Sequence, residues 1–87
     1  MVYSKGRIKK IKVISSFPRL LVRFTLDTSS GNINCIVGNQ AISQQVLLIP
    51  DGTKNISIAG HMNSRSQLVV EKMIYHINPS DYYKVGA

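Results

Sequence analysis

The stretch RLLVRFTLDTSSGNINCIV, residues 19–37, has the pattern of two β-strands joined by a turn. Apolar side chains recur at every second position in both halves, which is typical of strands with one face on a core. The residues between the halves, DTSSGN, are turn formers, so 19–28 and 33–37 are predicted to pair as an antiparallel hairpin. The predicted core face is Leu20, Val22, Phe24 and Leu26 followed by Ile33, Cys35 and Val37, and the opposite face of the first strand carries Arg19, Leu21 and Arg23.

A longer strand is predicted before the hairpin, over residues 2–14, VYSKGRIKKIKVI. Ile8 and Ile11 are three positions apart instead of two, which indicates a β-bulge at Lys9–Lys10, and Gly6 indicates a second bend. A basic amphipathic helix is the alternative, but the β-branched residues after Lys10 disfavour it. A bent first strand suits a small closed barrel, because one strand must curve into both halves of the sheet.

One helix is predicted after the hairpin, over QAISQQVLLI, residues 40–49. Asn39 is a suitable N-cap, and Ile42, Val46 and Ile49 share one helical face. Pro50-Asp51-Gly52 ends the helix with a turn. Two further strands are predicted, separated by a loop: the strand 55–60, the loop 60–66 and the strand 67–77.

The order of these elements is three strands, a helix and two strands. It predicts an all-β domain, a five-stranded Greek-key OB-fold barrel with one helix between strands 3 and 4. A small SH3-like barrel is the main competitor, but it has no helix of this length at that place. The domain is expected to span residues 1–78, followed by a C-terminal tail, 79–87.

The charge of the chain points to an anionic partner. Eleven basic residues oppose four acidic ones, which gives a net charge of +7. Five of the bases, Lys5, Arg7, Lys9, Lys10 and Lys12, fall in the first twelve residues. Phosphate polymers and anionic lipid headgroups are the partners that such a balance favours, although some small proteins are basic only to stay soluble.

Several classes of protein are disfavoured by what the sequence contains. The acidic residues are scattered, His61 and His76 have no partner at metal-ligand spacing, and we expect no enzyme, no metal and no cofactor. No apolar run reaches the length of a membrane helix, and a single cysteine fits a reducing compartment, so we expect a cytoplasmic protein without a membrane partner. Cys35 is predicted to be a buried apolar residue.

The chain resembles bacterial single-stranded DNA-binding proteins and the related primosomal replication protein PriB. The resemblance rests on GRI at 6–8, RFTL at 23–26, CIVG at 35–38, NISIAG at 55–60 and QLVVE at 67–71. It implies an OB fold, dimers or tetramers, binding of single strands and a place in DNA replication, repair or restart. Gly31 and Asn32 stand where the family often carries stacking aromatic residues.

OB barrels bind single strands across strands 2 and 3, between the loops that join strands 1 to 2 and 4 to 5. Phe17 is the best stacking candidate, with plugging of the barrel end as the alternative, and Arg19 and Arg23 contact phosphate unless they pair with Asp27 or Glu71. The four tyrosines, Tyr3, Tyr75, Tyr82 and Tyr83, are expected in the core or in an interface, with base stacking as the alternative. The predicted nucleic-acid site is Lys10, Lys12, Phe17, Arg19, Arg23, Asn34, His61 and Arg65, with Asn63 beside them.

Two functions follow from these residues. The first is binding of single-stranded DNA or RNA, DNA being favoured. The second is an OB-fold interaction module that docks on a larger replication or translation factor. Either function allows a homodimer, for which Leu21, Ile36 and Val69 are the candidate contacts.

Overall fold

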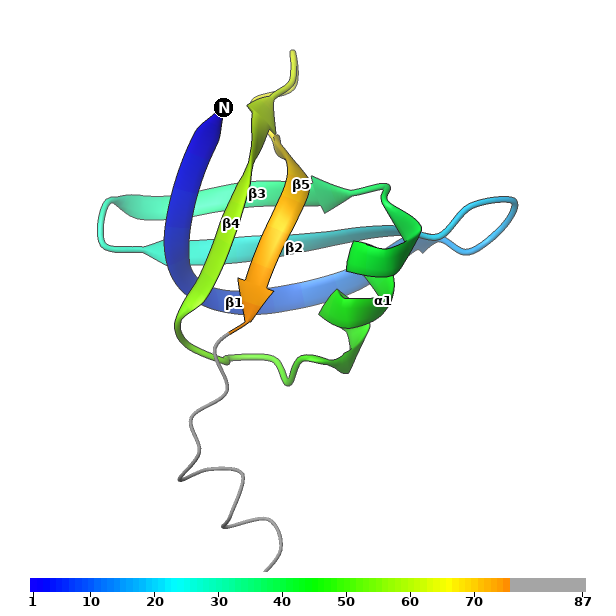
Figure 1. The fold of residues 1–87 in the computed structure, drawn as a ribbon, viewed down its shortest axis with the longest axis horizontal. Helices are drawn as coiled ribbons and strands as arrows, with labels where there is room; N and C mark the ends of the chain where they lie inside the picture. The colour runs from blue at the N-terminus through cyan, green and yellow to red at the C-terminus, as the bar shows by residue number, and fades with distance from the viewer. Residues whose placement is uncertain (76–87) are drawn as a thin grey trace, which may run out of the picture.

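The computed structural model describes residues 1–75, which form a closed barrel of five strands with one helix (Figure 1). The strand order around the barrel is β1-β2-β3-β5-β4, and β4 closes back onto β1. The helix lies between β3 and β4 in the chain, as in an OB-fold barrel. The predicted fold class is therefore confirmed. The elements are β1 Val2–Ser15, β2 Leu21–Thr28, β3 Gly31–Val37, α1 Gln40–Leu48, β4 Ile56–Met62 and β5 Leu68–Tyr75.

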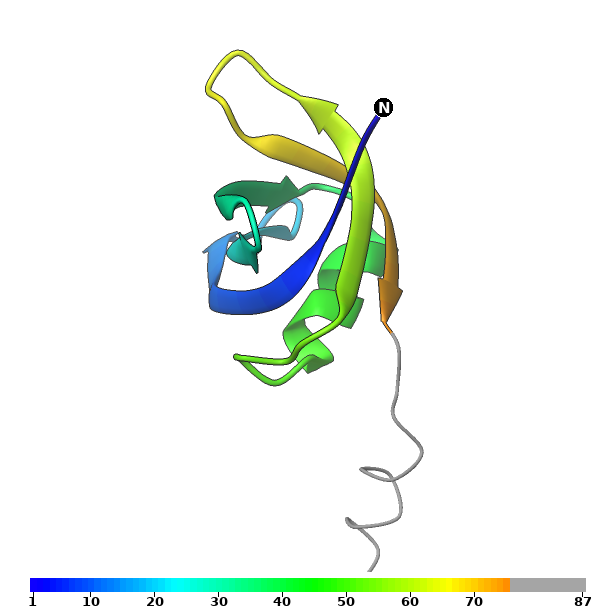
Figure 2. The same cartoon turned by 90° about the vertical axis from the view of Figure 1, so that its left-hand side faces the viewer.

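Strand β1 is bent at both places that the sequence indicates. Its first part, Val2 to Gly6, pairs with β4, and its second part, from Arg7 on, pairs with β2. Gly6 lies at this change of partner, where a Cβ would clash with the carbonyl oxygen of Asp27. The bulge falls between Lys9 and Lys12, and Lys10 adopts φ 57° there. One strand thus serves both halves of the barrel, and Figure 2 shows it curving round the sheet.

The barrel interior holds the alternating apolar residues of all five strands. Phe24 and Leu26 are fully buried at its centre, and Cys35 is buried with them. Burial raises the pKa of the Cys35 thiol to about 12, because the thiolate would lose its hydration. The remaining core residues on the strands are Ile8, Val22, Val37, Ile56, Ile58, Leu68 and Val70.

Helix α1 packs on one end of the barrel. Ile42 and Val46 are buried in the core, and Ile49, the C-cap residue, joins them. The predicted N-cap is confirmed, since Asn39 Oδ1 accepts a hydrogen bond from Ile42 N at 3.0 Å. Buried Ser43 is satisfied by donating from Oγ to the carbonyl oxygen of Val37 at 3.2 Å.

Several element boundaries differ from the sequence prediction. The turn of the first hairpin is only Ser29–Ser30, because the strands continue up to the pair Thr28 and Gly31. The predicted loop 60–66 is wrong at its start, since β4 runs to Met62 and pairs with β5 there. Residues 76–87 lie outside the described part, and with them the end of the predicted strand 67–77 and the predicted tail 79–87.

Candidate nucleic-acid interface

The outward face of β1, β2 and β3 carries a polar groove. Its volume is about 350 Å³. Three of its side chains are cations, contributed by the bulge of β1 and by the middle of β2. We call it the β1–β2–β3 groove, and its lining is Lys10, Lys12, Arg23, Phe24, Thr25, Asn34 and Gln67.

Strand register explains why these residues meet. Lys12 of β1 is paired directly with Arg23 of β2, so both side chains leave the same face of the sheet. Thr25, two residues after Arg23, is paired with Asn34 of β3. Lys10 reaches the same groove because the bulge takes it out of the regular alternation. The alternation and the bulge seen in the sequence thus indicate four of the residues that line the groove: Lys10, Lys12, Arg23 and Asn34.

The cations of the groove are not neutralised by acidic neighbours in the described part of the chain. Within residues 1–75, Asp27 forms an ion pair with Lys9 at 3.5 Å, and Glu71 lies 2.9 Å from His61, a contact that is an ion pair only when the imidazole is protonated. The alternative that Arg19 or Arg23 pairs with Asp27 or Glu71 is therefore wrong, because neither arginine lies within ion-pairing distance of a carboxylate in this range. The positive charge of Lys12 and Arg23 is left available to an external anion.

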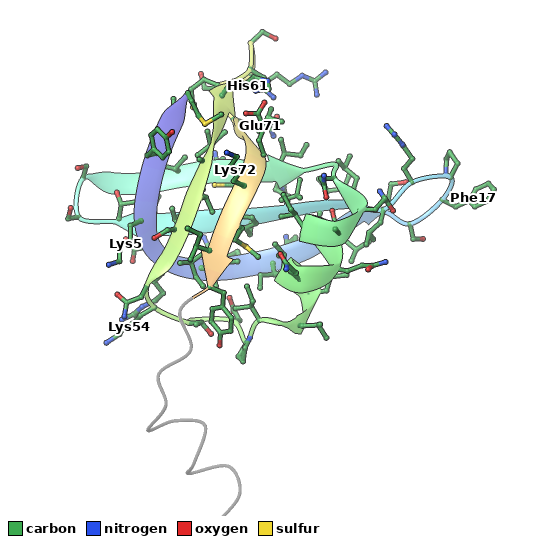
Figure 3. The ribbon with its side chains drawn as sticks, viewed as in Figure 1. Lys5, Phe17, Lys54, His61, Glu71 and Lys72 are labelled. Carbon is green, nitrogen blue, oxygen red and sulfur yellow. The ribbon has the colours of Figure 1, made fainter. Side chains whose placement is uncertain are left out.

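The loop between β1 and β2 lies beyond one end of the groove. Phe17 projects from its tip and is 87 % exposed, so the expectation that it plugs the barrel end is wrong (Figure 3). Arg19 is exposed and lines a separate, smaller hollow of about 210 Å³ at the base of the loop. Leu20 is outside β2, contrary to prediction. It is held by the Gln40 amide, which donates from Nε2 to Leu20 O at 3.1 Å and accepts from Leu20 N at 3.3 Å.

The loop between β4 and β5 lies beyond another side of the groove. Gln67, at its end, lines the groove, whereas exposed Arg65 does not. Asn63 organises this loop: its Oδ1 accepts from the backbone N–H groups of Arg65 and Gln67, both at 2.9 Å. Its amide nitrogen donates to Gln67 Oε1 at 3.0 Å. Asn63 is thus occupied with the loop itself, and its predicted contact with a ligand is not supported.

His61 is not the free loop residue that the sequence predicts. It belongs to β4, where it is paired in register with Val69 of β5, and its Nδ1 lies 2.9 Å from Glu71 Oε1. It does not line the groove, and only strand pairing around the barrel connects it with the groove residues. The row of directly paired residues runs through Lys12, Arg23, Ile36, Val69 and His61.

The sequence prediction of the site missed two polar groove residues, Thr25 and Gln67, and placed the third unpredicted lining residue, Phe24, in the core, where it is also buried. Thr25 had a signal, since it alternates with Arg23 on the outward face of the strand. No sequence pattern indicated Gln67, because its position depends on the parallel pairing of β5 with β3. Thr25 adds a hydroxyl group and Gln67 an amide to the cations, and these groups donate and accept hydrogen bonds from phosphate, sugar or base edges.

Two kinds of feature are absent from the part of the chain that the structure describes. Over residues 1–75 no three His, Cys, Asp or Glu side chains are grouped so that they could hold a metal ion. None of the helices in this range is long and apolar enough to span a membrane. The comparisons with protein-family models, curated proteins and solved structures found no match to this chain.

Proposed function

We propose that this chain is a non-enzymatic protein that binds single-stranded nucleic acid, with single-stranded DNA favoured, and that it acts in DNA replication, repair or restart. The observation that carries the proposal is the convergence of Lys10, Lys12 and Arg23 in one groove with the uncharged groups of Thr25 and Asn34. Cations there follow the phosphates of an extended strand, while the neighbouring polar groups tolerate different bases. The resemblance to bacterial single-stranded DNA-binding proteins points to the same ligand.

The exposed Phe17 supports this proposal, because single-strand binding proteins gain affinity from bases stacked on aromatic side chains. Arg23 adds a second flat group, since a guanidinium both pairs with phosphate and stacks on a base. One aromatic residue with a few cations predicts modest affinity with little sequence preference. A nucleic-acid duplex offers no unstacked bases, so it competes poorly for such a site.

Competition between nucleic acids tests the proposal. A fluorescent oligothymidylate is bound at low salt and then displaced with unlabelled single-stranded DNA, single-stranded RNA or duplex DNA of equal length. We expect both single strands to displace the probe at concentrations at least about tenfold below the duplex, DNA most effectively. Equal displacement by the duplex would show that the groove is a cationic surface without preference for single strands. Absence of binding at low salt would refute the function.

A second candidate function is an interaction module that docks on a larger replication or translation factor. It is favoured by an apolar hollow of about 370 Å³ between α1 and β5, beside Leu48, which is 83 % exposed. Leu21, Ile36 and Val69, predicted as exposed contacts, are half-buried instead. Retention of a partner from nuclease-treated lysate by the wild type but not by Leu48→Asp supports this function. Equal retention by both refutes docking at this hollow.

A homodimer remains a prediction under either function. Ile36 and Val69 are paired neighbours on β3 and β5, so together they offer a small apolar surface next to Arg23. Light scattering over a range of concentrations measures the molecular mass directly. A mass that stays at 9.7 kDa at high concentration contradicts the dimer.

A further inference from the structure

The outward face of β1 carries aromatic and basic side chains along most of its length. Ser4, Gly6 and Ile8 pair with residues whose side chains are buried in the barrel, so the residues between them point outward. Lys5 is paired with Ser57 of β4, and Lys9 with Thr25 of β2. We call these outward side chains the β1 track, which consists of Tyr3, Lys5, Arg7 and Lys9.

The bulge joins the β1 track to the groove. Without an extra residue, strict alternation after Lys9 would turn Lys12 into the barrel. The register shift between Lys9 and Lys12 reverses the alternation, so that Ile11 packs against the core and Lys12 points outward beside Arg23. The outward positions from Lys5 to Lys12 are therefore all basic, and the line of charge continues into the groove.

The β1 track also leads round the molecule. At Gly6 the strand changes its partner from β4 to β2, and Figures 1 and 2 show β1 wrapping from the β4 side of the barrel to the β2 side. A chain that follows β1 therefore passes from the groove to the outward face of β4 and β5. Ten residues of β1, from Tyr3 to Lys12, cover about 30 Å at the usual rise of a strand.

Most of the charge on the β1 track is available to a ligand. Lys9 has an acidic partner, Asp27 at 3.5 Å, while Lys5 and Arg7 have none at ion-pairing distance among the described residues. Beyond the track, Lys72 of β5 is paired across the sheet with Ala59, which is itself paired with Tyr3. Figure 3 shows Lys5 and Lys72 on the two sides of β4.

Tyr3 stands at the far end of the β1 track. It is 76 % exposed, so the core role expected for the tyrosines is wrong for Tyr3, while the interface and stacking roles stay predictions. Its cross-strand neighbour on β4, Ala59, is small and buried, and the ring beside it is mostly open to solvent. An exposed ring next to Lys5 combines a flat stacking surface with a phosphate-binding cation, which are the two elements of a single-strand site.

We propose that a bound single strand continues beyond the groove, follows Lys9, Arg7 and Lys5 along β1, and stacks a base on Tyr3. This inference rests on the proposed function and extends its site to a second subsite. A second copy of the chain is the less suitable occupant, because a twofold contact through this face would bring two sets of cations together. Continuity with the groove favours the same polyanion over a separate acidic protein.

The dependence of affinity on ligand length tests the second subsite. Oligothymidylates of about 4, 8, 12 and 16 nucleotides cover the site sizes of single OB folds. They are titrated into the wild type, Tyr3→Ala/Lys5→Ala and the matched control Tyr3→Phe/Lys5→Arg, which keeps the ring and the charge. Because Tyr3 and Lys5 are exposed, we expect all three proteins to fold alike, which thermal melting checks.

The alanine variant should bind the shortest measurable ligand with the affinity of the wild type. Its affinity for long ligands should fall by about five- to 150-fold, as expected when one base no longer stacks. The control variant should match the wild type at every length. Photocrosslinking of an oligonucleotide that carries 5-iodouracil at one position should label Tyr3 only in long ligands.

The outcomes separate this inference from the proposed function. If the wild type binds oligonucleotides and the alanine variant binds every length equally well, the groove stands and the second subsite is refuted. A loss that is the same at all lengths also refutes it, because Tyr3 and Lys5 would then act on the groove itself. If the wild type binds no oligonucleotide at low salt, the proposed function fails and this inference falls with it.

Discussion

Lys12 and Arg23 are directly opposite each other on β1 and β2, and both side chains point out of the barrel into the same groove. Like charges in this position destabilise a sheet, and within residues 1–75 no carboxylate is close enough to offset their repulsion. The repulsion between Lys12 and Arg23 therefore lowers the stability of the free protein. An anion bound in the groove would reduce this repulsion. This coupling between stability and binding leads to the first prediction.

Replacing Lys12 by glutamine should stabilise the free protein and weaken its binding to single strands. The expected gain in the free energy of unfolding is about 0.2–1 kcal/mol, the usual size of a cross-strand pair. Urea denaturation at low salt measures it, and the gain should shrink at high salt, where exposed charges are screened. Lys54→Gln is the matched control, since it removes one charge from an exposed position outside the groove. A larger gain in the control contradicts the prediction.

Replacing Phe17 by alanine should weaken binding without changing stability. The side chain is 87 % exposed, so its removal should alter the free energy of unfolding by no more than about 0.5 kcal/mol. Removal of one stacked base should cost about 1–3 kcal/mol of binding free energy, with Phe17→Tyr retaining most of it. Fluorescence titration measures the binding and urea denaturation the stability. An unfolding change of several kcal/mol would show that Phe17 supports the barrel after all.

Cys35 should be inert toward thiol reagents until the protein unfolds. Burial raises its pKa from 9.0 to about 12, and the reactive form is the thiolate. At pH 8 a disulfide reagent should therefore label the folded protein far more slowly than the urea-unfolded chain. Labelling at equal rates in the two states would place Cys35 at the surface.

The same pKa predicts how stability depends on alkaline pH. Between pH 9.0 and about 12 the folded protein keeps the Cys35 proton while the unfolded chain releases it. The contribution of the thiol is therefore fully present below pH 9 and is lost as the pH rises towards 12. Denaturation at several pH values should show a steeper alkaline loss of stability in the wild type than in Cys35→Ala. Equal slopes would contradict the shift.

Alanine at Gly60 should destabilise the barrel strongly. A Cβ there would clash with the carbonyl oxygen of Val69, which belongs to the neighbouring backbone and cannot rotate away. We expect a loss of at least about 2–3 kcal/mol, as for overpacked cores. Gly38→Ala is the matched control, because its Cβ would meet one side-chain atom at 3.9 Å, an ordinary contact. Equal stability of the two variants would contradict the close approach of β4 and β5.

The sequence predicts the barrel well because the deciding information is local. Alternation in 19–37 places Phe24 inside and Arg23 outside, and the spacing of Ile8 and Ile11 marks the bulge. The start of the loop after Gly60 was misplaced for a non-local reason. Gly60 suggests a strand end, whereas the fold uses it for the approach of β5, and β4 continues because Met62 finds its partner in Leu68.

The site was predicted in part, for the same reason. Residues that reach the groove through strand alternation, such as Lys12 and Asn34, were identified, whereas residues placed by tertiary contacts were not. Nothing local indicates that Glu71 lies against His61, or that Tyr3 pairs with a residue as small as Ala59. Both contacts depend on the strand order of the barrel, in which β4 pairs with β1 on one side and with β5 on the other.

The central claim is that Lys12 and Arg23 contact the phosphates of a bound single strand, and the salt dependence of oligothymidylate affinity tests it most directly. The slope of log affinity against log salt becomes shallower by about 0.7 for each phosphate that the protein no longer neutralises. The account predicts that Lys12→Ala/Arg23→Ala flattens the slope by about 1.4 relative to the wild type. The control Lys54→Ala/Lys72→Ala removes the same charge outside the groove. With a short ligand, this control should change the slope less than the groove variant does. A slope that is unchanged in the groove variant, or changed equally in both variants, would contradict the account.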